Sequence, residues 1–459
     1  MEQDRNVLVL SAARTAIGKY GGGLAAVPPC DLAATVVREA VSRAGVQADD
    51  VGHAVFGHVI HTEPRDMYLS RVAAVNGGLP VETPAFTVNR LCGSGLQAIV
   101  SAAQAIKLGD CDVAVAGGAE SMSRAQYWLP GMRWGQRMGD GTVVDAMVGA
   151  LTDPFDGCHM GVTAENVAAD YHVSREEQDA LAVESHRRAA AAVEAGYFTE
   201  QITPVQVPGR KGTTTVDTDE HIRPGVTAAD LARLKPAFAR EGTVTAGNAS
   251  GVNDAAAAAG YFASQITPVQ VPSRKDAVTV DADEHIRPGL TIADLARLKP
   301  AFAPEGTVTA GNASGVNDAA AAVVLAGQDY AERHADAALG WLVAYAHAGV
   351  EPRVMGIGPV PAVRAVLERA HLKLDDIDLF EVNEAFAAQA LAVVKELGLP
   401  ADRTNPNGSG ISLGHPVGAT GAILTVKALY ELRRTGGRYA LVTMCIGGGQ
   451  GIAAVFERL

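Results

Sequence analysis

Short apolar runs alternate along this chain with segments in which apolar residues recur at helical spacing. A short apolar run is typical of a buried strand, and a period of about 3.6 residues is typical of a helix with one apolar face. The runs predict strands at residues 6–10, 53–60, 85–91, 112–116, 377–382 and 439–444. The spacing predicts helices at residues 31–44, with Asp31 as the N-cap, and at 95–108, 174–195, 384–397 and 418–433.

The first and last parts of the chain follow the same order of turn, helix, strand and consecutive glycines. We therefore expect an α/β fold of two similar βα halves, with a middle region inserted from about Arg124. The middle region contains a tandem repeat, in which residues 195–258 and 259–322 are identical at 54 of 64 positions. Two copies without further repeats are not a solenoid, and their near-identity indicates a recent duplication.

Composition and charge narrow the class of protein. Apolar residues make up 48% of the 459 residues, which is enough for a buried core and excludes a disordered chain. The net charge of −13 argues against a nucleic-acid partner. No apolar run reaches the ~18–20 residues that a membrane span needs, and the first twenty residues lack the pattern of a secretory signal. Five cysteines without metal-ligand spacing favour reduced thiols in the cytoplasm, with no metal site.

Cys92 lies in the segment NRLCGSG, where a predicted strand ends and a predicted helix begins. The free N–H groups and partial positive charge of a helix N-terminus are expected to lower the pKa of this thiol and to favour the thiolate. The glycines on either side of Ser94 would let a ligand approach the backbone closely. A free cysteine is most often a small buried apolar residue, but this position makes Cys92 a candidate nucleophile.

Two further candidates lie in glycine-rich segments near the end of the chain. His415 stands between a glycine and a proline in NGSGISLGHPVGATG, and its near-neutral imidazole could take the proton of a thiol. Cys445 ends a predicted strand and runs into GGGQG, whose exposed backbone N–H groups suit an oxyanion site. A surface histidine and a core cysteine are the ordinary alternatives for these two residues. The remaining cysteines lack such surroundings and are expected to be structural: Cys30, Cys111 and Cys158.

These segments, together with NEAF at residues 383–386, resemble the thiolase family, in particular its acetyl-CoA acetyltransferase and β-ketothiolase branch. The resemblance runs from SAARTAIG near the start to CIGGGQGIAAVFERL at the end, and it includes HMGVTAEN and GNASGVND. The segment HVIHTEPRDMYLSRVAAVNGG is similar to bacterial broad-range β-ketothiolases. The resemblance implies a layered α/β/α/β/α fold and a transferase that condenses acyl-CoA with acetyl-CoA, or cleaves 3-ketoacyl-CoA, through an acyl-cysteine. It also implies coenzyme A and acyl-CoA as substrates, no permanently bound cofactor, and a homotetramer.

The resemblance also implies a role for each site residue. Cys92 would carry the acyl group, His415 would activate Cys92, and Cys445 would move the α-proton of the second acyl-CoA. Asn383 would hold a water in one oxyanion hole, and the backbone N–H groups of Cys92 and Gly447 would form the other. The residues expected to contact coenzyme A or the substrate are His159, Met160, Arg287, Ser314 and Met355. For Arg287, a solvated surface charge is the alternative.

A family member needs only one copy of the repeat, so this chain carries a surplus copy. The expected division is an N-terminal half at residues 1–124 plus about 305–330, an inserted loop domain at 125–304, and a C-terminal half at 331–459. We expect the second copy to supply the strand and turn at 307–318, because it leads directly into apolar VVLAG.

Two other functions remain open at this point. A ketosynthase-type condensing enzyme would carry a histidine where Cys445 stands, and a CoA-binding protein inactivated by the surplus copy would bind coenzyme A without turnover.

Overall fold

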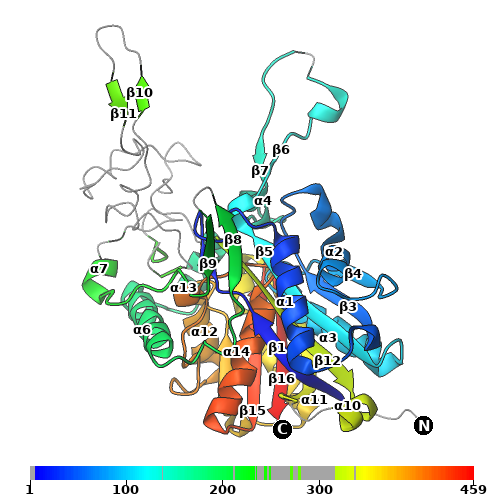
Figure 1. The fold of residues 1–459 in the computed structure, drawn as a ribbon. Coiled ribbons are helices and arrows are strands. Elements are labelled where there is room, and N and C mark those ends of the chain that lie inside the picture. The colour runs from blue at the N-terminus through cyan, green and yellow to red at the C-terminus, as the bar shows by residue number, and fades with distance from the viewer. Residues whose placement is uncertain are drawn as a thin grey trace.

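The computed structural model describes residues 6–136, 138–209, 212–232, 234, 242–245, 248–249, 269–271, 278–280, 316–334 and 338–459. Most of these residues build one body, drawn as the coloured ribbon in Figure 1. The predicted Arg287 and Ser314 lie outside the described residues.

A mixed sheet of ten strands runs through the body, in the order β14-β15-β16-β13-β1-β12-β5-β3-β4, with β2 paired to β12. Its strands are β1 (Val7–Arg14), β2 (Gly18–Lys19), β3 (Val51–Gly57), β4 (Ala85–Val88), β5 (Val113–Ser121), β12 (Asn317–Gly327), β13 (Gly340–Gly349), β14 (Leu379–Val382), β15 (Tyr439–Ile446) and β16 (Gln450–Arg458). The central strands are apolar and buried along nearly their whole length, as expected for a sheet covered on both faces.

The two parts of this sheet repeat one another. In the N-terminal part, β3 is parallel to β5, β5 is antiparallel to β12, and β12 is antiparallel to β1. In the C-terminal part, β14 is parallel to β15, β15 is antiparallel to β16, and β16 is antiparallel to β13. A short antiparallel contact between β1 and β13 joins them. The expectation of two similar halves is confirmed.

Helices cover the sheet in layers. The principal helices are α1 (Pro29–Ala44), α2 (Leu69–Asn76), α3 (Ser94–Leu108), α10 (Gln328–His334), α11 (Pro359–Ala370), α12 (Ala387–Leu397), α13 (Gly410–Leu413) and α14 (Thr420–Thr435). α1 packs on the outer face of the N-terminal part and α11 on the outer face of the C-terminal part, while α3 and α14 pack on each other between the two parts. Three buried apolar clusters correspond to the central layer and the two outer layers. The expected α/β/α/β/α arrangement is therefore confirmed.

Most predicted elements form, with differences at their ends. Helix α1 begins at Pro29, and Asp31 lies in its first turn instead of capping it, because Pro28 and Pro29 already hold the backbone angles of a helix start. Strand β4 ends at Val88, three residues earlier than predicted, since Leu91 turns the chain with a positive φ of 42°. Strand β3 likewise ends at Gly57. These early ends leave the residues that follow as loops, and the loops build the site.

The middle region lies between β5 and β12. Its described elements are β6 (Tyr127–Trp128), β7 (Val144–Asp145), α4 (Ala146–Ala150), α5 (Met160–Asp170), α6 (Arg175–Glu194), β8 (Val205–Gly209), β9 (Gly212–Val216), α7 (Ala228–Ala232), β10 (Val269–Val271) and β11 (Val278–Val280). Helix α6 begins where predicted, because Ser174 and Glu177 form a reciprocal capping box. The hairpin of β6 and β7 carries an arm that projects away from the body (Figure 1). Among the described helices, none is both long and apolar enough to cross a membrane.

Both copies of the repeat contribute to the body. Asp219 of the first copy forms a buried ion pair with Arg14 at 2.7 Å. Ala249, near the end of that copy, forms an isolated β-bridge with Phe386. The second copy supplies the start of β12, as expected. At the expected turn, the described residues are instead those of the first copy, 243–245 and 248–249, and residues 307–315 of the second copy lie outside the described residues. In the repeat register Ala249 corresponds to Ala313, three residues before Val316, so Ala249 and Val316 are one copy length plus three residues apart.

Candidate active site

Loops from both halves meet around one pocket. It holds about 530 Å³ of empty space, and its walls contain the three predicted chemical groups, Cys92, His415 and Cys445. Its lining residues are Leu91, Cys92, Met122, Ala150, Leu151, His159, Met160, Met355, Ala385, Phe386, His415, Val417, Cys445 and Gly447. Apart from the thiols and imidazoles this wall is mainly apolar, so it can receive an acyl chain and exclude water from a reacting thioester.

Cys92 lies in the tight turn between β4 and α3. The turn is held by Ser94, whose hydroxyl accepts a hydrogen bond from the Arg90 N–H at 2.8 Å and donates one to the Leu91 carbonyl at 2.6 Å. The left-handed backbone of Leu91 completes the reversal. As a result, the thiol of Cys92 faces the pocket while the next residues enter the helix.

The pKa of Cys92 differs from the sequence expectation. Desolvation of the thiol raises its pKa to about 11, although hydrogen bonds from the backbone N–H groups of Gly447 and of Cys92 itself lower it. The expectation of a lowered pKa at the start of α3 is therefore wrong, because removal from water outweighs the helix terminus. The thiol form of Cys92 therefore predominates at neutral pH, and a base would be needed for this residue to act as a nucleophile.

His415 supplies a neutral imidazole whose orientation is fixed. Its Nδ1 lies 2.6 Å from the hydroxyl of Thr420, which donates its proton to the Pro416 carbonyl at 2.9 Å. The hydroxyl must then accept from Nδ1–H, which leaves Nε2 unprotonated and able to take a proton. Burial lowers the pKa of His415 to about 4, so the ring is neutral at pH 7. Asn317, the first residue of β12, anchors this loop by accepting a hydrogen bond from the His415 backbone N–H at 3.0 Å.

Asn383 lies beside the imidazole, at the end of β14. Its Nδ2 is 3.4 Å from Nε2 of His415, which is a long hydrogen bond. Its Oδ1 is buried and has no hydrogen-bond partner among the described residues. A buried amide oxygen of this kind suits a water or a substrate group as its partner.

Cys445 is the second thiol of the pocket and stands at the end of β15. Burial raises its pKa well above the usual range, and the neighbouring Cys92 raises it further. The turn that follows needs glycine, because Gly448 and Gly449 have φ values of 80° and 83°. This turn brings the Gly447 N–H to the sulfur of Cys92. One β-turn therefore positions both the second thiol and a hydrogen-bond donor to the first.

The structure brings together only part of the predicted substrate contacts. His159, Met160 and Met355 line the pocket. Nδ1 of His159 accepts a hydrogen bond from the Gly161 N–H at 3.0 Å, so the ring proton is on Nε2. Arg223, the first-copy counterpart of Arg287, is half-buried, and burial lowers the pKa of its guanidinium.

Three residues near the site were not found from the sequence: Thr420, Asn317 and Glu120. Thr420 and Asn317 hold His415 as described above, and Glu120 accepts a hydrogen bond from the Gly418 N–H in the same loop at 2.9 Å. Asn317 belongs to the segment GVND, which carried part of the resemblance, so a signal for it was present. No sequence pattern marked Thr420 or Glu120, because the role of each residue depends on hydrogen bonds that form only in the folded protein.

Comparisons with protein families match most of the chain. The model described as the thiolase N-terminal domain matches residues 7–259 and 255–329, and the model of the thiolase C-terminal domain matches residues 337–458. Among curated proteins, beta-ketothiolase BktB of Cupriavidus necator is 57% identical over 455 residues, covering 99% of this chain and 100% of that protein. The cytosolic acetyl-CoA acetyltransferase of Mus musculus is 40% identical and covers 98% of both chains.

Solved structures are similar over the whole length. The acetyl-CoA acetyltransferase of Bacillus anthracis superposes with a TM-score of 0.85 at 39% identity, covering 100% of both chains. Human mitochondrial 3-ketoacyl-CoA thiolase in complex with CoA superposes with a TM-score of 0.83 at 38% identity, covering 99% of this chain and 98% of that one.

Proposed function

This chain belongs to the thiolase family and is an acyltransferase, and from that premise we propose how its residues divide the chemistry. Thiolases act on CoA thioesters, without a permanently bound cofactor, in a reversible Claisen condensation. The observation that carries the proposal is the single pocket lined by Cys92, His415 and Cys445. Two thiols and one imidazole provide a nucleophile, its base and a second acid/base.

The first half-reaction transfers an acyl group to Cys92. The sulfur of Cys92 attacks the thioester carbonyl while Nε2 of His415 takes its proton. Concerted transfer is required, because the thiol has a raised pKa and the imidazole a lowered one. The backbone N–H groups of Cys92 and Gly447 stabilise the oxyanion. The C–S bond to coenzyme A then breaks, and Cys445 gives its proton to the departing thiolate.

The second half-reaction makes the carbon–carbon bond. Cys445, now a thiolate, removes the α-proton of acetyl-CoA, and its raised pKa makes it a stronger base for this weakly acidic C–H. A water held by Oδ1 of Asn383 stabilises the enolate oxygen. The carbanion attacks the acyl-Cys92 carbonyl, the Cys92 thiolate leaves, and His415 returns the proton to it. Cleavage of 3-ketoacyl-CoA is the reverse of these steps.

Substrate binding and assembly follow from the surroundings of the pocket. His159, Met160 and Met355 would contact the pantetheine and acyl parts, with Ser314 and Arg287 or their first-copy counterparts nearer the nucleotide.

The exposed apolar side chains of the β6–β7 arm include Trp134 and Met138, which are 88% and 92% exposed. Such an arm suits burial against other subunits, so we infer a homotetramer. The two thiols must stay reduced, which fits the cytoplasm.

We expect the purified protein to cleave acetoacetyl-CoA in the presence of coenzyme A, with a turnover number of about 1–10³ s⁻¹. Loss of the 3-ketoacyl-CoA enolate absorbance measures the rate. A malonyl thioester is the control substrate, and its decarboxylating condensation in place of thiolysis would indicate the ketosynthase alternative. Binding of coenzyme A without thiolysis would instead indicate an inactive homologue.

The repeat provides a second test. We propose the division into residues 1–124 with about 305–330, 125–304 and 331–459, in which one copy is surplus. Deleting residues 250–313 joins Ala249 to Ser314 and keeps every described contact of the first copy and of β12. We expect the resulting 395-residue protein to keep thiolysis within about threefold and to gain up to ~3–4 kcal/mol in unfolding free energy, because a long loop no longer has to be closed.

The matched control is deletion of residues 195–258, which also leaves 395 residues but keeps the second copy in place of the first. The two proteins differ at only ten positions, so both should be active, and light scattering should give the mass of four chains for each. An inactive 250–313 deletion beside an active full-length protein would show that the surplus copy is needed.

A further inference from the structure

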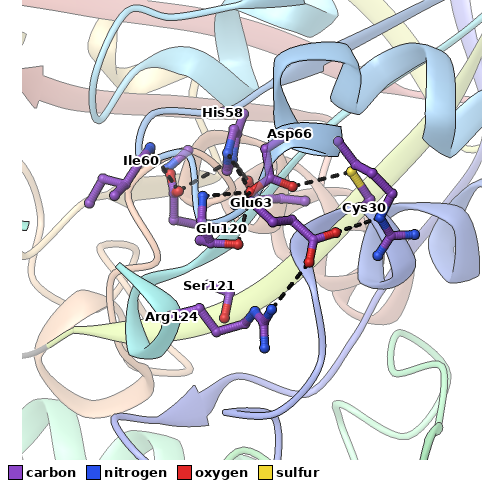
Figure 2. A network of polar contacts seen from close by, with 12 residues as sticks. Cys30, His58, Ile60, Glu63, Asp66, Glu120, Ser121 and Arg124 are labelled. Atoms are coloured by element: carbon purple, nitrogen blue, oxygen red, sulfur yellow. Dashed lines mark hydrogen bonds and ion pairs between the residues drawn. The ribbon is translucent and has the colours of Figure 1, made fainter. Parts of the chain in front are cut away.

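One buried carboxylate beneath the pocket takes no part in the mechanism above. Glu120 lies near the end of β5 and is fully buried. Its Oε1 accepts a hydrogen bond from the Ile60 N–H at 3.1 Å, and its Oε2 accepts from the Val59 N–H at 3.1 Å and the Gly418 N–H at 2.9 Å. The carboxylate thus connects the loop after β3 to the loop that carries His415. Figure 2 shows Glu120 beside Ile60 and His58 of the first of these loops.

The tie to the His415 loop is short and closely packed. Gly418 is three residues after His415 and two before Thr420, whose hydroxyl fixes the ring. A Cβ on Gly418 would stand 2.5 Å from Oε2 of Glu120 and 3.0 Å from the Cα of His58, so no space separates the loop from its anchor. The N–H groups of Ala419 and Thr420 both bond to the Pro416 carbonyl. A shift of Gly418 would therefore move the imidazole.

Other charged or titratable groups also face this carboxylate. Nδ1 of His58 is 3.3 Å from Oε1 and donates to the Ala119 carbonyl at 2.9 Å, while Nε2 of His58 is 3.9 Å from Asp66. The ring of His58 stacks on exposed His61 (Figure 2 shows His58 and Asp66 beside Glu120). Burial raises the pKa of Glu120 to about 8 against the effect of its backbone N–H donors. Above about pH 8, where Glu120 is ionised, its negative charge contributes to the raised pKa of Cys92.

We propose that Glu120 is a positioning residue for the reaction, which anchors the His415 loop to β5 through the Gly418 N–H. The inference rests on the proposed roles of His415 and Cys92. It links one side chain to the base, which it holds in place, and to the nucleophile, because above about pH 8 the ionised carboxylate also opposes the ionisation of Cys92.

The test compares Glu120→Gln with Glu120→Asp. Glutamine keeps the shape but removes the charge and offers a single acceptor oxygen to three N–H groups. We expect kcat for thiolysis to fall about 10- to 100-fold with KM for coenzyme A changed less than about twofold, because a small misplacement of a catalytic group has costs of this order. The pH midpoint for alkylation of Cys92 by iodoacetamide should move to lower pH. Aspartate keeps the charge but is shorter, so kcat should fall while the midpoint stays near that of the wild type.

Asp66→Asn is the control within the same network. Asp66 is buried and accepts hydrogen bonds from the Thr62 hydroxyl and the Glu63 N–H, and within the described part of the chain none of its hydrogen bonds reaches the His415 loop. Its variant should lose thermal stability while keeping kcat and the alkylation midpoint. Unchanged kcat and midpoint in Glu120→Gln, or an equal shift in Asp66→Asn, would overturn the inference. Alkylation needs no turnover, so it tests Glu120 even if the wild type proves inactive in thiolysis, and Glu120→Asp serves if the glutamine variant does not fold.

Discussion

Replacing Cys92 by alanine is expected to reduce both thiolysis and condensation by at least ~10⁴-fold, because the variant lacks the thiol that we propose as the carrier of the acyl group. The wild type incubated with labelled acetyl-CoA should acquire one acyl group per chain, bound as a thioester and released by hydroxylamine. Cys92→Ala should acquire none. Mass spectrometry of the digested protein identifies the acylated peptide.

Cys111→Ala is the matched control for this experiment. Cys111 is also a partly exposed free cysteine, but it lies at the other end of α3, next to the start of β5. The variant should be acylated and active like the wild type. Full activity in Cys92→Ala, or a label that remains in it, would remove the basis of the proposed mechanism.

Replacing Cys445 by alanine should separate the two half-reactions. Because we propose that Cys445 moves the α-proton, we expect condensation and thiolysis to fall by about 10²–10⁴-fold, the usual contribution of a general acid/base. Acylation of Cys92 should still occur, more slowly, because water or coenzyme A itself can supply the proton to the leaving thiolate. Rapid-quench measurement of acyl-enzyme formation, beside the steady-state rate, distinguishes the two effects.

Exchange of the α-hydrogens gives an independent measurement. In deuterated water the wild type should incorporate deuterium at the α-carbon of bound acetyl-CoA, and Cys445→Ala should not. An alanine variant that exchanges at the wild-type rate would mean that another group removes the α-proton.

Sequence patterns were sufficient to predict the layers of the fold and to select three candidate groups that line one pocket, but they did not predict the protonation state of those groups. Cys92, His415 and Cys445 stand in glycine-rich turns whose residue types already indicate their chemistry, and they do line one pocket. The direction of the Cys92 pKa shift was predicted wrongly, because desolvation depends on what the other half of the molecule packs over the sulfur. The role of Thr420 depends in the same way on a turn that brings its hydroxyl to His415.

The repeat shows a different limit. Near-identical copies can make the same contacts. From the sequence, only the apolar residues that follow the second copy favoured one copy over the other. The fold uses the first copy where Asp219 meets Arg14 and Ala249 meets Phe386, and the second copy from Val316 into β12. A sequence comparison of two such copies cannot show this division, since the partners that decide it lie hundreds of residues away.

The close contact of α3 with α14 fixes the distance between the two loops that carry Cys92 and His415. Cys92, the proposed nucleophile, lies just before α3, and His415, the proposed base, lies just before α14. Where the two helices meet, a methyl group on Gly95 would come within 2.8 Å of the Ala422 nitrogen, and one on Gly421 within 2.3 Å of the Leu96 nitrogen. The helices can approach this closely only because both positions are glycine. An alanine at Gly95 or Gly421 would push the helices apart, and it would lengthen the distance between Cys92 and His415 although neither residue is changed.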